Sequence, residues 1–182
     1  LAGGGDIAGA VDMLERAQQA GDADAARQLA IWCLTGRWFG RDLKASRALF
    51  GRAAALGDGA AAAVYRAFLA NGTGGNRDWR SAMALLREAA ASDAAAADED
   101  RLLGGMDLDG DGGPRSVPAG SRLSDKAEIV KFPAFLTAAE CTYLIGAATP
   151  LLEPSVVVDP RSGQFVPHPI RTSSGAAFPL VS

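Results

Sequence analysis

The fold of this chain is decided by residues 41–58, RDLKASRALFGRAAALGD. The carboxylate of Asp42 can cap the free N–H groups at the start of a helix, and Gly57 can adopt the left-handed conformation that ends one. Between them, apolar residues recur at helical spacing and predict one buried stripe. Its predicted members are Ala45, Ala48, Leu49, Ala53 and Leu56.

The same pattern returns every 36 residues. Asp6, Asp42 and Asp78 are 36 positions apart, and the pair Gly21-Asp22 returns as Gly57-Asp58. Matched positions at a fixed period indicate a stacked helical array. The apolar and small positions that follow this period are Met13, Leu49 and Leu85, then Leu14, Phe50 and Leu86, then Ala17, Ala53 and Ala89.

Each unit is predicted to be a helix pair, with about six helices between Asp6 and Leu103. The second helix of the middle unit is expected from about Ala60 to Ala70. The third unit departs from the pattern, because Asp93 replaces the turn glycine and residues 101–106 show no clear second helix. We therefore expect the array to end there. The inward-facing residues of the middle unit's second helix are predicted to be Val64, Ala67 and Phe68.

Charge and hydropathy exclude some classes of function. The 182-residue chain has a net charge of −3 and a pI of about 5.1, which argues against a nucleic-acid surface. No apolar run approaches the roughly 18 residues that span a bilayer, so no membrane partner is expected. The start shows no secretion signal, which favours the cytoplasm. Because the first residue is Leu, however, export stays open, and we expect the chain to be part of a longer protein.

Single residues add further hypotheses. Cys33 occupies the repeat position of Leu69, which predicts a small core residue. Together with Cys141 it makes two unpaired thiols, which favour a reducing compartment. Three aromatic residues could either form an exposed contact surface or pack the loops between helices; they are Trp38, Phe39 and Trp79.

The segment after the repeats is acidic. Asp107, Asp109 and Asp111, with Gly112 next, match the start of a calcium-binding loop. The position that should carry a bidentate glutamate is Pro118, however. A solvated acidic linker over residues 106–125 is the alternative, and its glycines and prolines favour it.

From residue 126 onward the pattern changes to strand, helix and strand. Residues 129–132 predict a strand, and Thr137 to Glu140 form a capping box for a helix that Pro150 ends. Residues 155–158 predict a second strand, and residues 159–163 a turn. The helix is expected to present one face formed by Cys141, Leu144, Ile145 and Ala148.

The predicted fold is thus mainly α. A helix-pair solenoid over residues 1–105 is followed by the linker at 106–125 and an incomplete α/β segment at 126–182. This last segment is too short to close a barrel, so its strands should leave unpaired edges and an exposed apolar face.

The repeat resembles a known family, the Sel-one-like repeat, which is related to the tetratricopeptide repeat. The resemblance covers roughly residues 6–103 and implies a right-handed α-solenoid that contacts a protein or peptide partner. Alternatively, the array binds nothing and only spaces or caps the next domain. The matching positions are Gly36, Arg41-Asp42, Lys44-Ala45, Ala48-Leu49, Ala53-Ala54 and Gly57-Asp58.

Four short stretches occur together in the last segment: Phe135-Leu-Thr-Ala-Ala-Glu-Cys141, Leu144-Ile145, Leu151-Leu-Glu-Pro-Ser155-Val and Arg171-Thr-Ser-Ser174. Together they resemble the start of the prolyl-hydroxylase-like domain of the iron- and 2-oxoglutarate-dependent dioxygenases, where the double-stranded β-helix begins. The resemblance covers about residues 126–182. It implies Fe(II) and 2-oxoglutarate as cofactors of the parent protein, with ascorbate as a further candidate.

The residues for iron are not in this chain. That family holds iron with a His-x-Asp pair and a distant second histidine, whereas the one histidine here, His168, lies between two prolines. The chain alone is therefore expected to hold no cofactor or metal and to be inactive. The resemblance makes Arg171 and Ser173 candidate substrate-binding residues. An ion pair of Arg171 with Asp159 or Glu153 is the alternative.

Two functions follow from these observations. The chain is either part of a dioxygenase whose repeats recruit the substrate, or a non-enzymatic interaction scaffold with an unrelated C-terminal cap.

Overall fold

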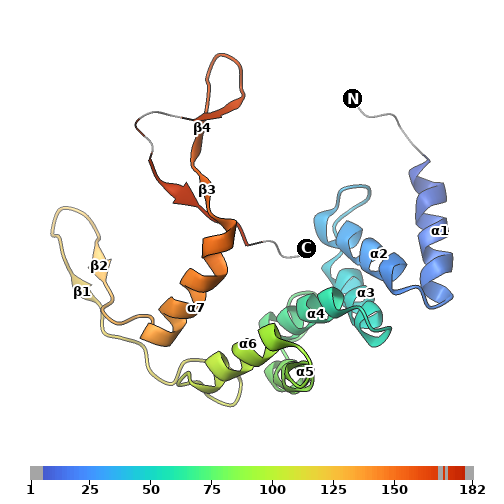
Figure 1. Ribbon diagram of the computed structural model, residues 1–182, viewed down its shortest axis with the longest axis horizontal. Coiled ribbons are helices and arrows are strands. Elements are labelled where there is room, and N and C mark those ends of the chain that lie inside the picture. The colour runs from blue at the N-terminus through green and yellow to red at the C-terminus, as the bar shows by residue number, and fades with distance from the viewer. Residues whose placement is uncertain (1–5, 168–169, 171, 179–182) are drawn as a thin grey trace. The chain divides into compact units, whose positions relative to one another are not determined.

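The chain divides in sequence between Arg115 and Ser116 into two units (Figure 1). The computed structural model describes residues 6–167, 170 and 172–178. We call residues 6–115 the helical unit and residues 116–178 the C-terminal unit, and describe each by itself. The helical unit therefore extends ten residues beyond the predicted boundary at 105.

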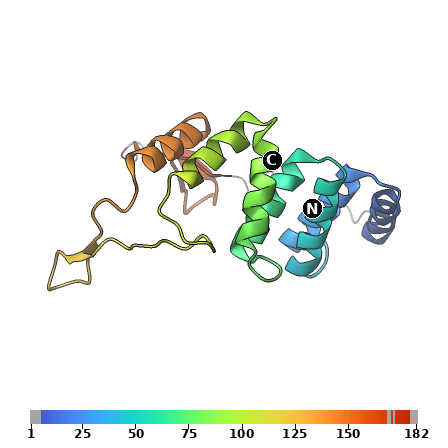
Figure 2. The same cartoon turned by 90° about the horizontal axis from the view of Figure 1, so that it is seen from below.

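The described part of the helical unit contains six α-helices, and each packs on the next in sequence (Figures 1 and 2). This confirms the expected array of helix pairs. The helices are α1 (Ile7–Gln19), α2 (Ala23–Thr35), α3 (Leu43–Ala55), α4 (Gly59–Asn71), α5 (Trp79–Ala90) and α6 (Ala94–Gly104).

Aspartates begin the helices, as the period predicts. The carboxylates of Asp6, Asp42 and Asp78 accept the backbone N–H three residues later, at 2.8, 2.9 and 3.0 Å. Each bond satisfies one of the N–H groups that a helix start leaves unpaired. The turns within the first two pairs use Gly21 and Gly57 at φ of 97° and 95°, a conformation open to glycine.

In the third unit the prediction that no clear second helix forms was wrong, because α6 is present. The first helix of this unit, α5, has 12 residues where α1 and α3 have 13. The capping aspartate therefore comes one position early, at Asp93, where its carboxylate accepts from the N–H of Ala95 at 2.9 Å. Asp93 is thus the counterpart of the cap Asp58, and Ser92 takes the place of the glycine.

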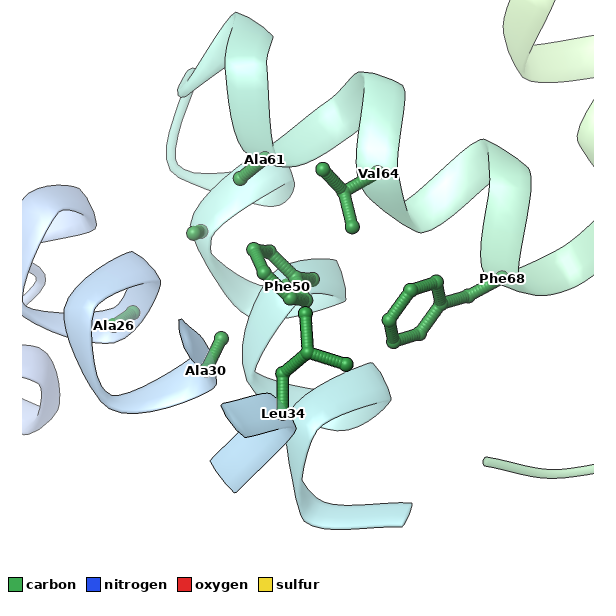
Figure 3. Close-up of a cluster of buried hydrophobic side chains, with 8 residues drawn as sticks. Ala26, Ala30, Leu34, Phe50, Ala61, Val64 and Phe68 are labelled. Atoms are coloured by element: carbon green, nitrogen blue, oxygen red, sulfur yellow. The ribbon is translucent and has the colours of Figure 1, made fainter. Parts of the chain in front are cut away.

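The predicted buried stripe of α3 is only partly correct: Ala53 is buried and Ala45 and Leu49 are half-buried. Its buried residues are Ser46, Phe50 and Ala53, whereas Ala48 is exposed and Leu56 is 42% exposed. The reason is that α3 packs on both α2 and α4, so its buried face turns toward Phe50, whose ring meets Phe68 edge-on at 5.5 Å. Figure 3 shows the cluster that results, with all of its residues labelled except Ala53: Ala26, Ala30, Leu34, Phe50, Ala53, Ala61, Val64 and Phe68.

In the C-terminal unit the predicted capping box is confirmed. Thr137 accepts from the N–H of Glu140, and Glu140 accepts from the N–H of Thr137, at the start of α7 (Ala138–Ala148). A 3₁₀ turn at Thr149–Leu151 contains Pro150, so the helix ends where predicted. Three separate antiparallel pairs join β1 to β2, β3 to β6 and β4 to β5. Their strands are β1 (Ser121–Arg122), β2 (Val130–Lys131), β3 (Glu153–Pro154), β4 (Val156–Val158), β5 (Phe165–Pro167) and β6 (Ser174–Gly175).

The strands of the C-terminal unit are short and form no continuous sheet. None of its described side chains is buried, and Phe135, Ile145 and Phe165 are 67, 66 and 74% exposed. The expected unpaired edges and exposed apolar surface are therefore present in this unit. The start of a double-stranded β-helix stays a prediction.

Candidate interaction groove

A groove of about 490 Å³ runs over α2 between α1 and α3. We call it the first-unit groove. Each helix contributes residues at helical spacing, because positions four apart lie on one helix face. Its lining consists of Val11, Glu15, Gln18 and Gln19 from α1, Leu29 and Cys33 from α2, Phe39 from the next loop, and Ala45 and Leu49 from α3.

The floor of this groove is apolar and buried. Leu29 and Cys33 are 4 and 7% exposed, and both belong to α2, which packs on α1 and α3. Leu49 is half-buried and packs against the central core. The predicted role of Cys33 as a small core residue is confirmed. Burial, and then the nearby charge of Asp42, raises the pKa of its thiol, which makes this cysteine a weak nucleophile at neutral pH.

The α1 wall supplies the polar groups of the groove. The side-chain oxygen of Gln18 is buried and has no hydrogen-bond partner among the described residues. Leaving such an acceptor unpaired costs about 1–3 kcal/mol. Glu15, one turn earlier, is exposed and forms no ion pair within the described part of the chain. The guanidinium of Arg52 holds the end of α1 to α3 by donating to the Gln18 carbonyl at 2.6 Å.

The predicted aromatic residues divide between packing and exposure. Phe39 and Trp38 both contact Trp32 edge-on, at centroid distances of 6.5 and 6.2 Å, so they pack the first inter-repeat loop. Trp38 nevertheless remains 43% exposed. Trp79 packs against the cluster of Met83, Leu86 and Ala96 at the end of the array.

The acidic segment folds onto the helical unit. A Cβ atom on Gly112 would lie 2.3 Å from the Trp79 ring, so this glycine contacts the indole directly. Asp109 accepts from the N–H groups of Asp111 and Gly113 at 2.9 and 2.8 Å, and these bonds lower the pKa of its carboxyl. Arg115 lies 3.6 Å from Asp107.

These contacts bear on the calcium hypothesis. The described residues contain no group of three or more His, Cys, Asp or Glu side chains positioned to hold a metal ion. The carboxylate of Asp109 instead closes its own turn.

Of the two predicted substrate-binding residues, the structure describes Ser173. Arg171 and His168 lie outside the described residues. The hydroxyl of Ser173 is 3.1 Å from that of Ser155, and its carbonyl accepts from the Ser155 N–H at 2.9 Å. Ser173 thus helps to hold two segments of the C-terminal unit together, and its substrate role stays a prediction.

Known proteins offer limited comparison. No family model and no curated protein matches the chain. Among solved structures, the chain is similar to a Sel1 repeat protein from Oxalobacter formigenes, at 27% identity and a TM-score of 0.45. The similarity covers 52% of this chain and 39% of that one, so this chain spans about two fifths of that protein's length. The 36-residue period and the packing of six capped helices identify residues 6–104 as a helical repeat.

Sequence reasoning missed the first-unit groove. A signal was nevertheless present in the period, because Leu29 and Cys33 are smaller than their counterparts Tyr65 and Leu69.

In the part of the chain that the structure describes, no helix is long and apolar enough to cross a bilayer.

Proposed function

We propose that the helical unit is a Sel-one-like scaffold that binds a protein or peptide partner. The observation that carries the proposal is the first-unit groove, an apolar concavity with polar groups on one wall. Sites with this composition are the usual ligand-binding surfaces of folded proteins. The sequence resemblance to Sel-one-like repeats supports the same function.

Site-specific photo-crosslinking tests this proposal. A photoreactive amino acid replaces either Leu49 in the helical unit or Thr142 in the C-terminal unit, and the full chain is exposed to a lysate of the organism that encodes it. We expect cross-linked partners from position 49 that recur between replicates. The proposal fails if neither position yields a specific product, or if only position 142 does.

We further propose that the C-terminal unit corresponds to the leading part of a prolyl-hydroxylase-like dioxygenase domain. The resembling stretches at residues 135–174 support this, and so does the observed order of β2, α7, β4 and β5. The repeats would then recruit or orient the substrate of the parent protein. The competing function is a scaffold without enzymatic activity.

The residues present do not fit the iron of that family. Its donor set needs two histidines and a carboxylate, while this chain has one histidine. We therefore expect the chain to produce no succinate from 2-oxoglutarate and Fe(II) above a heat-killed control. The coding sequence beyond Ser182 separates the two functions: a His-x-Asp motif, a later histidine and a basic residue support the dioxygenase, and a stop codon or another repeat supports the scaffold.

A further inference from the structure

We propose that the first-unit groove binds a short extended peptide that carries apolar side chains and a basic residue. This deepens the proposed scaffold function and rests on it. The groove's volume of about 490 Å³ falls within the roughly 300–1,000 Å³ of ligand pockets. That volume suits a few residues of a peptide better than the surface of a folded domain.

The groove is specific to the first unit, and the repeat itself shows why. Moving by 36 positions replaces Leu29 with Tyr65 and Cys33 with Leu69. The ring of Tyr65 lies directly over Gly51 of α3, since a Cβ there would be 3.0 Å from the ring. Gly51 is the counterpart of Glu15. In the second unit, therefore, a tyrosine covers the helix surface that the first unit leaves open.

The unpaired side-chain oxygen of Gln18 favours a bound peptide in an extended conformation. Its burial without a partner leaves an acceptor that a bound donor would satisfy. No donor among the described residues holds this oxygen in place. Because the terminal torsion of a glutamine is broad, we expect the amide to be able to turn toward an occupant. Backbone N–H groups inside a helix are already bonded within it, whereas those of an extended chain are free.

The negative charge of Glu15 is the reason to expect a basic residue in the peptide. Glu15 lies one turn from Gln18 on the same face of α1 and forms no ion pair with any described residue. The other groove residues carry no ionised side chain. The Arg52 guanidinium beside the α1 wall already donates to the Gln18 carbonyl at 2.6 Å. Among the lining residues, Glu15 therefore offers a carboxylate beside an apolar floor, which favours a lysine or arginine next to apolar residues in the partner.

The test begins with a phage-displayed library of random linear peptides, selected on the full chain. The selected peptide is then synthesised with a dye, and its Kd is measured by fluorescence anisotropy. We expect the enriched sequences to combine alternating apolar residues with a lysine or arginine. Failure to enrich any sequence would overturn the proposal.

Filling the groove with the second unit's own residues is the decisive variant. Leu29→Tyr with Cys33→Leu introduces the second unit's side chains. In that unit the tyrosine ring lies over Gly51, whereas Glu15 stands at the matching position of the first unit, so we expect the new ring to occupy the groove. We expect this double variant to weaken peptide binding by on the order of tenfold or more, which is at least about 1.4 kcal/mol. Circular dichroism checks whether this variant is folded.

A charge reversal keeps the test valid if the double variant does not fold. Glu15→Lys should weaken binding of the basic peptide about two- to fivefold at low salt, and exchanging the peptide's basic residue for glutamate should restore it. Glu88→Lys, an exposed glutamate on α5, is the matched control and should change nothing. If peptides bind but ignore both groove variants, the groove assignment is wrong while the scaffold function survives.

Discussion

Gly74 is a residue whose backbone position tolerates no side chain. It has a φ of 72°, and a Cβ atom there would lie 2.1 Å from the carbonyl oxygen of Leu43. The left-handed conformation alone costs a non-glycine residue about 1–2 kcal/mol. We expect Gly74→Ala to lower the free energy of unfolding by more than about 2 kcal/mol, since the clash adds to that conformational cost. Urea unfolding of the full chain measures it.

Gly59 is the matched control for Gly74. It begins α4 with an ordinary φ and with open space around the position of a Cβ. Gly59→Ala should be neutral or stabilise the protein by up to about 1 kcal/mol. Equal losses for the two alanine variants would show that the close approach of Gly74 to α3 does not exist in solution.

Asp58 acts at the scale of elements, because it links two helices. One carboxylate oxygen caps α4 by accepting from Ala61 at 2.9 Å, and the other receives the guanidinium of Arg27 on α2 at 2.6 Å. Its side chain is only 10% exposed. Asp22 has the cap bond to Ala25 and forms no ion pair with any described residue.

We therefore expect Asp58→Ala to cost more unfolding free energy than Asp22→Ala. Losing a cap costs about 0.5–2 kcal/mol, and a hydrogen bond to a charged group contributes about 1.5–3 kcal/mol. Chemical denaturation compares the two variants. In an Arg27→Ala background the difference should shrink, and its persistence would assign the effect of Asp58 to the cap alone.

The start of α7 should respond to pH through Glu140. Hydrogen bonds from Thr137, the backbone N–H first, lower the pKa of Glu140 below its usual value of 4.5. A lowered folded-state pKa means that the stabilisation is complete above the ordinary value and is lost as pH falls through the lowered one. A carbon-detected NMR titration should place the midpoint of Glu140 below 4.5.

The neutral variant Glu140→Gln keeps an acceptor oxygen at this position and carries no charge. It should remove this acid sensitivity from the amide exchange of α7. A Glu140 midpoint at or above the ordinary value would contradict the capping box.

At the scale of the whole molecule, the two units should differ in stability. The helical unit buries a continuous cluster around Phe50, whereas no described side chain of the C-terminal unit is buried. Regions with few buried apolar contacts open at low free energy. In hydrogen exchange, we expect slow exchange for α2 to α4 and fast exchange for the described residues of the C-terminal unit. Comparable protection in both units would refute this expectation.

The helix starts and the period were predictable from sequence because they depend on local chemistry. An aspartate at Asp42 or Asp78 caps a helix through its own nearby N–H groups, and a glycine such as Gly57 ends one through its own φ. The capping box of α7 was predictable for the same reason. The prediction for the third unit was wrong because α5 is one residue shorter than α1 and α3. A fixed 36-residue period therefore places the next helix start one position too late.

The candidate site was harder to predict, because its groove depends on residues from three helices. Val11, Leu29 and Leu49 are ordinary apolar residues that become a concave surface only when α1 and α3 pack on α2. The predicted Ser173 instead forms contacts within the C-terminal unit.

By itself, the sequence determined where the helices begin, how often they recur, and that one histidine cannot form the iron site of a dioxygenase. Only the tertiary structure decided which side of α3 is buried and where the repeat surface stays open. The physical reason is the separation in sequence between the residues that interact. Caps and turns are made by neighbours in the chain, whereas the buried face of Phe50 and the space over Cys33 depend on which helices pack against them.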